Sequence, residues 1–132
     1  NSVIGYMFNN HSGFLLVDKS DYLRNEFFRI ILEHIQLMAE ISMTMLSESL
    51  DAYVEKDLKK AEAVIKRDDE VDDLFDKVKN ELINIIHENV NDGEQAANLL
   101  MAAKYMERIG DHATNISEWV IFSITGKHEE EQ

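Results

Sequence analysis

Apolar residues recur every three or four positions over most of the chain, which is the period of an amphipathic α-helix. The first such series begins near Asp21, weakens after Leu50 and ends near Val54. Its members are Leu23, Phe27, Ile31, Ile35, Met38, Ile41 and Met45. This series predicts a long first helix that buries one stripe of side chains.

Two further series follow, each after a short polar connection. They consist of Ala61, Val64, Val71, Phe75, Val78, Leu82 and Ile85, and of Leu99, Ala103, Met106, Gly110, Ala113, Val120 and Ile124. Asp57 is placed to cap the second helix. Asp92 and Gln95 have the spacing of a capping box for the third helix, and Gly126 is placed to end it. We therefore predict an all-α fold, an antiparallel up-down-up three-helix bundle over residues 21–127.

The two ends of the chain do not share this period. Within residues 1–20, the apolar runs 3–8 and 14–17 flank the turn-rich stretch NNHSG, a pattern of a tail or a small hairpin. Residues 128–132 are polar and predict a solvated C-terminal tail. Because the chain begins with Asn1 rather than Met, we expect a fragment, a processed form or a partly ordered chain.

Composition narrows the range of partners. The 132 residues make one domain, and their net charge is −13, so contacts to nucleic-acid phosphates are not expected. Cations and basic protein surfaces suit such a chain. It has no cysteine, which excludes a disulfide framework and a thiolate metal site. No apolar run approaches the roughly 20 residues of a transmembrane helix.

Acidic residues gather at two places where a solvated helix face does not explain them. The stretch RDDEVDDLFDK places six acids within nine residues, although Asp is a poor residue for a helix interior: Asp68, Asp69, Glu70, Asp72, Asp73 and Asp76. Asp68 also falls on the apolar stripe, where an unpaired charge is costly. In the third helix, Glu107 and Asp111 flank Gly110, which lies on the apolar stripe of that helix.

The two acidic groups lie at matching levels of the predicted bundle. Counted from a turn near Asn91, Asp68–Asp72 and Glu107–Asp111 differ by about one helical turn. Four carboxylates at one level cannot all stay ionised without compensation. Either some are protonated, or they hold cations, or they pair with the nearby bases Lys66, Arg67, Lys104 and Arg108.

Cation binding defines the candidate site. Its predicted ligands are Asp68, Asp72, Glu107 and Asp111, with an extended stripe of Asp69, Asp73, Asn115 and Glu118. Oxygen ligands suit Mg²⁺, Mn²⁺, Ca²⁺ or iron, whereas a closed zinc site is disfavoured without cysteine. Gly110 would let the two helices approach closely enough for short Asp side chains to share an ion.

The sequence lacks the residue patterns of other common metal, catalytic and phosphate-binding sites. The chain has no Glu-x-x-His pair of a di-iron centre, no nucleophile elbow and no phosphate-cradling glycine loop. His34 and His87 are interpreted as core or boundary histidines, and Trp119 as a core or interface residue. We therefore do not expect an enzyme.

The motifs RDDEVDDLF and MERIGDHATNISEWVIF, the latter followed closely by TGK, resemble those of the PhoU family of bacterial phosphate-signalling regulators. The preceding stretch MAEISMTMLSESLDAYVEKDLKKAEAVI is similar to the family pattern in the same order. The resemblance covers roughly residues 37–127 and corresponds to the second of the family's two three-helix repeats.

The resemblance implies metal ions bound at paired acidic motifs, including multinuclear clusters. Carried over, the pairs are Asp68 with Asp72 and Glu107 with Asp111, while Asn115 and Glu118 match family positions of less defined role. The implied ions are divalent or ferric, without distinction between iron, Mn, Mg and Zn.

The resemblance also implies a cytoplasmic regulator that acts by binding rather than by catalysis. Such proteins restrain phosphate uptake through the phosphate ABC transporter and link it to a membrane sensor kinase. Because only one repeat is recognised, we expect either a fragment or a single-repeat relative that forms a homodimer. Two alternatives stay open: an acidic interaction module without a functional metal, and a regulatory tail of a larger phosphate-transport protein.

Overall fold

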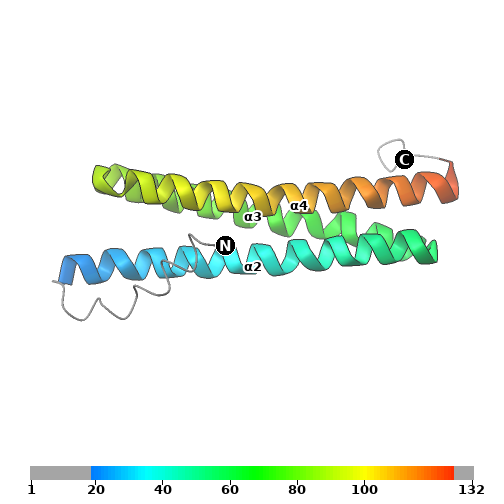
Figure 1. Cartoon of the computed structure of the whole chain (residues 1–132), viewed down its shortest axis with the longest axis horizontal. Helices are drawn as coiled ribbons and strands as arrows, with labels where there is room; N and C mark the ends of the chain where they lie inside the picture. Colours follow the sequence, from blue (N-terminus) through cyan, green and yellow to red (C-terminus); the bar gives the residue numbers. More distant parts are fainter. Residues whose placement is uncertain (1–18, 127–132) are drawn as a thin grey trace.

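Three long helices form an antiparallel bundle. The computed structural model describes the backbone of residues 19–126 and the side chains of residues 25–126. Helix α2 spans Lys19–Glu55, α3 spans Leu58–Glu88 and α4 spans Gly93–Thr125, with the short 3₁₀ turn η2 at Val90–Asp92. Helix α3 returns alongside α2, and α4 runs in the same direction as α2 (Figure 1). The predicted all-α, up-down-up architecture is confirmed.

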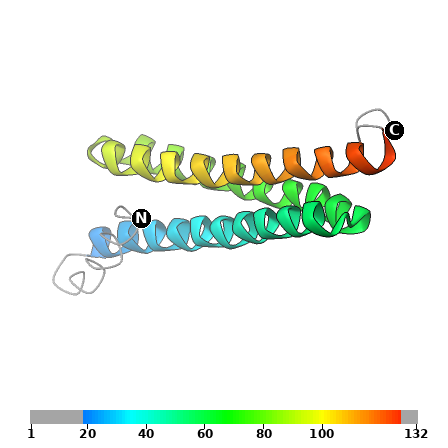
Figure 2. The ribbon, with the colours of Figure 1, turned by 45° about the vertical axis from the view of Figure 1, so that its right-hand side comes forward.

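The three helices stay together along their length, and each contacts the other two. In the view of Figure 2, α3 lies behind the pair formed by α2 and α4. Among the described residues, no helix is both long and apolar enough to cross a membrane. Helix α2 begins two residues before the predicted start of the bundle. The rest of the predicted N-terminal tail or hairpin, and the tail at 128–132, lie outside the described residues.

The connection between α2 and α3 is a single tight turn. Lys56 adopts a left-handed φ of 55°, and the Asp57 N–H donates to the Ala52 carbonyl at 3.0 Å. A left-handed residue with such a hydrogen bond is a common way to end a helix. The Asp57 carboxylate then accepts a hydrogen bond from the Lys60 N–H at 3.1 Å. The predicted N-cap of α3 is therefore confirmed.

The start of α4 differs from its prediction. Asp92 occupies the N-cap position, but its side chain makes no capping hydrogen bond, so the predicted capping box is wrong. The turn is instead organised by Asn89, whose side chain accepts from the Asn91 N–H and whose carbonyl accepts from the Asp92 N–H. At the other end, Gly126 closes α4 with a φ of 77°, as predicted.

The core follows the predicted stripes except at the ends of the bundle. Most predicted stripe positions are buried, together with Phe28, Leu32, Ala52, Ala96 and Ile121. Two predictions are wrong: Phe27 is 56% exposed and Ile124 is 40% exposed. Their neighbours Phe28 and Ile121 are buried instead. Four residues rotate a helix by about 400°, so a series spaced by four drifts around the helix by about 40° at each step. Near the end of the bundle, fewer neighbouring side chains cover such a series.

The histidines and the tryptophan lie at the margins of the core. His34 Nδ1 lies 3.0 Å from Glu81 Oε1 across α2 and α3, so the interpretation as a satisfied boundary histidine is confirmed for His34. His87 is exposed. Trp119 is 62% exposed and meets Phe122 edge to face, so a place in the core is excluded for it.

Candidate metal centre

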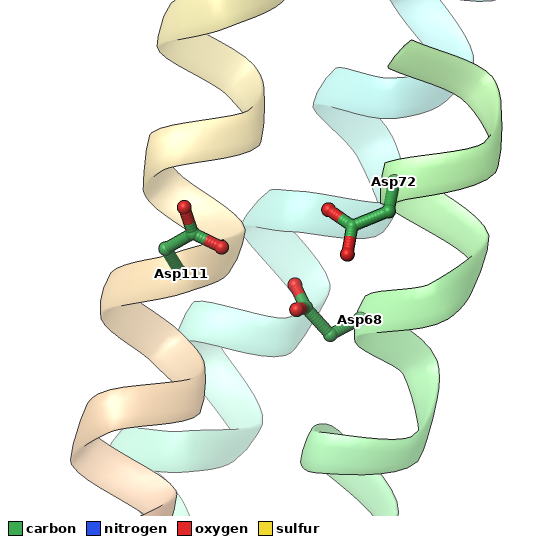
Figure 3. A group of neighbouring side chains, drawn as sticks. All are labelled: Asp68, Asp72 and Asp111. Atoms are coloured by element: carbon green, nitrogen blue, oxygen red, sulfur yellow. The ribbon is translucent and has the colours of Figure 1, made fainter. Parts of the chain in front are cut away.

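Three aspartates from two helices meet near the middle of the bundle. Asp68 and Asp72 lie one turn apart on α3, and their carboxylates point toward Asp111 on α4 (Figure 3). Each contributes an oxygen atom to a group in which these atoms all lie within 4.8 Å of one another. We call this group the aspartate cluster. The four-residue spacing on α3 sets both side chains on the face that packs against α4.

Gly110 brings α4 close to the cluster. A Cβ atom at this position would lie 3.3 Å from Asp68 Oδ1, 3.6 Å from Ser42 Oγ and 3.6 Å from Val71 Cγ1. Any larger residue would therefore press on the carboxylate. This geometry bears out the close approach predicted for Gly110. A glycine inside a helix lowers helix stability by about 1 kcal/mol relative to alanine, and the close approach of α4 explains why glycine stands here.

Ser42 supports the same contact from α2. Its side chain is fully buried, and its hydroxyl donates a hydrogen bond to the Met106 carbonyl at 2.8 Å. This bond ties α2 to the turn of α4 that precedes Gly110. The sequence analysis did not single out Ser42. A small polar residue next to Ile41 on the apolar face of the first helix was the signal that could have found it.

Asp68 carries an electrostatic strain that the fold does not relieve. Among the described residues, its Oδ1 is a buried oxygen without a hydrogen-bond partner. Burial raises the pKa of Asp68 to about 6, and the charges of Asp72 and Asp111 add to the shift. Burial also raises the pKa of Asp72, with Glu107 and Asp111 contributing. Carboxylates whose charged form is disfavoured by burial and by like charges are those that a bound cation would stabilise most.

Glu107, the fourth predicted ligand, is not part of the aspartate cluster. Its carboxylate pairs with Lys104 Nζ at 2.6 Å, one turn earlier on α4. The lysine also lies over the Phe75 ring, 5.1 Å from its centre. Glu107 nevertheless lies near enough to raise the pKa of Asp68 and of Asp72. Of the three outcomes that the sequence allowed for the acidic groups, ion pairing with a nearby base is the one that Glu107 shows.

The other bases do not neutralise the cluster. Arg67 lies 3.7 Å from both Glu48 and Glu70, rather than beside an aspartate of the cluster. Within the described part of the chain, no ion pair joins Asp68, Asp72 or Asp111 to a lysine or arginine. The extended stripe of four residues lies outside the cluster: Asp69, Asp73 and Asn115 are exposed, and Glu118 is half-buried.

The donor atoms fit a hard cation. Three carboxylates supply only oxygen, which is the ligand set preferred by Mg²⁺, Mn²⁺, Ca²⁺ and iron. The buried, unpartnered Oδ1 of Asp68 supplies an acceptor that the protein itself leaves unused. Asp111 is exposed, so water could complete the coordination of an ion at this place. The residues present therefore fit a metal site, with Asp68, Asp72 and Asp111 as its protein ligands.

These features define a class of protein: an all-α bundle of three long helices that carries an aspartate cluster between two of them. The PhoU domain family matches residues 35–120, which include all three aspartates. The chain belongs to the PhoU family.

Three relatives carry the same printed name, phosphate-specific transport system accessory protein PhoU homolog. The one from Clostridium acetobutylicum is 45% identical over 105 residues, covering 80% of this chain and 48% of the relative. Those from Rhizobium meliloti and Caulobacter vibrioides are 38% and 39% identical, covering 72% and 70% of this chain and 39% and 40% of the relative.

The chain thus spans about half the length, or less, of these curated relatives. No solved structure matches it.

Proposed function

We propose that this chain is a regulatory domain of phosphate uptake and phosphate-responsive signalling in the cytoplasm, and that it carries metal ions on the α3/α4 face. The observation that carries the regulatory role is its similarity to accessory proteins of the phosphate-specific transport system. The observation that supports the metal is the aspartate cluster with its unpartnered buried oxygen. The domain acts by binding, not by catalysis.

The metal site is tested by titration with Mn²⁺, Mg²⁺, Fe³⁺ and Zn²⁺ separately. The variant Asp68→Asn/Asp111→Asn removes one ligand charge from each helix and keeps the side-chain size. Its matched control is Glu40→Gln/Asp51→Asn, which removes two charges from exposed positions of α2. We expect the first variant to lose metal binding by tenfold or more, because a carboxylate is a far better ligand than an amide.

Equal metal uptake by wild type and by Asp68→Asn/Asp111→Asn would refute the metal assignment. Loss of uptake in the α2 control as well would show that net charge, rather than the cluster, holds the ions. Elemental analysis of the purified protein gives the resident metal and its stoichiometry, and thus shows whether one ion or several are bound.

For the partners, we propose the phosphate ABC transporter and the membrane sensor kinase that responds to phosphate. The net charge of −13 favours a basic surface on the partner. The alternative is an acidic interaction module, or a regulatory tail of a larger phosphate-transport protein, without a functional metal. Partner binding measured by pull-down with and without EDTA separates these. Binding that needs the metal supports the proposal, and salt-sensitive binding that ignores EDTA supports the alternative.

A homodimer is proposed as well. Large apolar side chains near the C-terminal end of α2 are exposed, namely Leu50, Tyr53 and Val54. A second copy could cover them, since apolar surface gains free energy when it leaves water. Native mass spectrometry of wild type and of Leu50→Glu/Val54→Glu tests this. A monomeric wild type at micromolar concentration would exclude the dimer.

A further inference from the structure

A second feature of the bundle lies away from the aspartate cluster, in a groove between α2 and α3. The groove has a volume of about 400 Å³. Phe27 and Ile31 line it from α2, and Glu81, Asn84, Ile85 and Glu88 line it from α3. Glu81 follows Asp72 by nine residues, or about 13 Å along α3. The groove is therefore a separate place from the candidate metal centre.

The floor of the groove is apolar. Ile31 and Ile85 are almost fully buried beneath it. Phe27 forms part of its wall and exposes more than half of its surface, although its position on the apolar stripe predicted a core residue. An exposed aromatic ring beside two aliphatic side chains offers a surface for a hydrocarbon chain, and its face can also attract a cation.

Two carboxylates stand on the α3 wall at either end of this floor. Glu81 and Glu88 are seven residues apart, which is about two turns and about 10 Å along the helix. Glu81 is held in place by His34 Nδ1 at 3.0 Å, while Glu88 is exposed. None of the described residues that line the groove is a lysine or an arginine.

We propose that this groove binds a linear polyamine. Its two terminal ammonium groups pair with Glu81 and Glu88, its methylene groups lie over Ile85 and Ile31, and its internal ammonium lies against the exposed Phe27 ring. Charge complementarity favours such a ligand, because two negative groups are separated by an apolar strip and the whole chain is strongly acidic. A single metal ion is a poor match, because the two glutamates stand about two helical turns apart along α3.

The proposal is tested by isothermal titration of the full chain with spermidine. We expect Glu81→Gln/Glu88→Gln to weaken binding by about tenfold or more, because two charge-assisted hydrogen bonds are lost. Glutamine at 81 still offers His34 an acceptor. The matched control Glu40→Gln/Asp51→Asn loses the same charge on the exposed face of α2 and should bind nearly as wild type does. Circular dichroism verifies that each variant is folded.

Two comparisons distinguish the groove from general charge attraction. 1,8-Diaminooctane, which carries the same two charges as putrescine on a longer methylene chain, should bind more tightly than putrescine, and Phe27→Ala should weaken spermidine binding while leaving the charges unchanged. Asp68→Asn/Asp111→Asn should bind spermidine as wild type does, so failure of the metal site leaves this result intact. Equal weakening in the α2 control, or loss of binding in the Asp68/Asp111 variant, would overturn the proposal.

Other occupants have their own signatures. Nuclear Overhauser contacts from residues 1–18 to Ile85 that persist at saturating spermidine would assign the groove to the chain's own N-terminal segment and overturn the proposal. Chemical-shift changes confined to α2 and α3 around Phe27 and Ile85 on adding spermidine would support it.

Discussion

The pKa of Asp68 links the site to the stability of the bundle. A carboxyl group whose pKa is higher in the folded than in the unfolded chain binds more protons when folded, at pH values between the two. Its contribution is present below the unfolded value and is lost as pH rises through the folded value. For Asp68 the folded pKa is about 6 against an ordinary 3.8, and Asp72 shifts in the same direction.

We therefore predict that the metal-free protein becomes more stable as pH falls from 7 toward 4.5. Solvent screens part of the effect, so we expect about 1 kcal/mol. Urea unfolding in EDTA at several pH values measures it. The Asp68→Asn variant should lose most of this slope, whereas Glu40→Gln/Asp51→Asn should keep it. An unchanged slope in Asp68→Asn would contradict the strain assigned to this carboxylate.

Gly110 permits a second prediction at the residue scale. Alanine at this position gains about 1 kcal/mol of helix propensity but meets Asp68 Oδ1 at 3.3 Å. The two effects oppose each other, so Gly110→Ala should change the unfolding free energy by less than about 1 kcal/mol. Gly110→Val adds two methyl groups to the same contact and should destabilise by about 1–3 kcal/mol.

The matched control for both substitutions is Gly93→Ala, because no neighbouring atom lies within 4 Å of a Cβ there. Urea denaturation of the four proteins measures the differences. If Gly110→Val proved as stable as wild type, α3 and α4 would not approach as closely as described.

At the scale of elements, the sequence predicts what depends on helical period and local chemistry. The three apolar series locate the helices, because each must bury one stripe. Asp57 and Gly126 act where predicted, since each serves its own helix end. Asp92 does not, because Asn89 organises a 3₁₀ turn that no periodicity reveals. Counting residues from the turn between α3 and α4 correctly places the aspartates of these helices at the same level. The same count cannot show whether another side chain forms an ion pair with a predicted ligand.

Glu107 shows that limit. Its four-residue spacing from Asp111 puts both on one side of α4, which is why the sequence groups them. The side chain then turns to Lys104, three residues earlier, at 2.6 Å. Whether Glu107 points toward the aspartate cluster or toward Lys104 depends on side-chain rotamers and on the position of Phe75 under the lysine. Those are properties of the packed bundle rather than of the spacing.

The cap at the start of α3 gives an element-scale prediction. Asp57→Ala removes the hydrogen bond to the Lys60 N–H and should lower the unfolding free energy by about 1 kcal/mol. The control Asp51→Ala removes a charge from an exposed position within α2, where alanine is the better helix former. Thermal unfolding followed by circular dichroism measures both. A loss in Asp51→Ala equal to that in Asp57→Ala would show that charge, not capping, is responsible.

On the scale of the whole molecule, the aspartate cluster lies between α3 and α4. These helices pack against each other, but their only covalent connection is η2 at one end of the bundle. An ion held by Asp68, Asp72 and Asp111 would join α3 to α4 near their middle. Because the unfolded chain cannot present these three ligands together, binding would stabilise the folded state alone. The metal-binding proposal therefore predicts a change in global stability, not only a local one.

At a free metal concentration 100 times the dissociation constant, the stabilisation is about 2.7 kcal/mol, which raises the midpoint of thermal unfolding by several degrees. We expect the rise with the metal that elemental analysis identifies, and its reversal by EDTA. Asp68→Asn/Asp111→Asn should show no rise, and in EDTA it should be at least as stable as wild type, because it no longer crowds like charges. Glu40→Gln/Asp51→Asn should respond to metal as wild type does. A wild-type midpoint that is indifferent to metal would mean that the cluster does not bridge α3 and α4 through an ion.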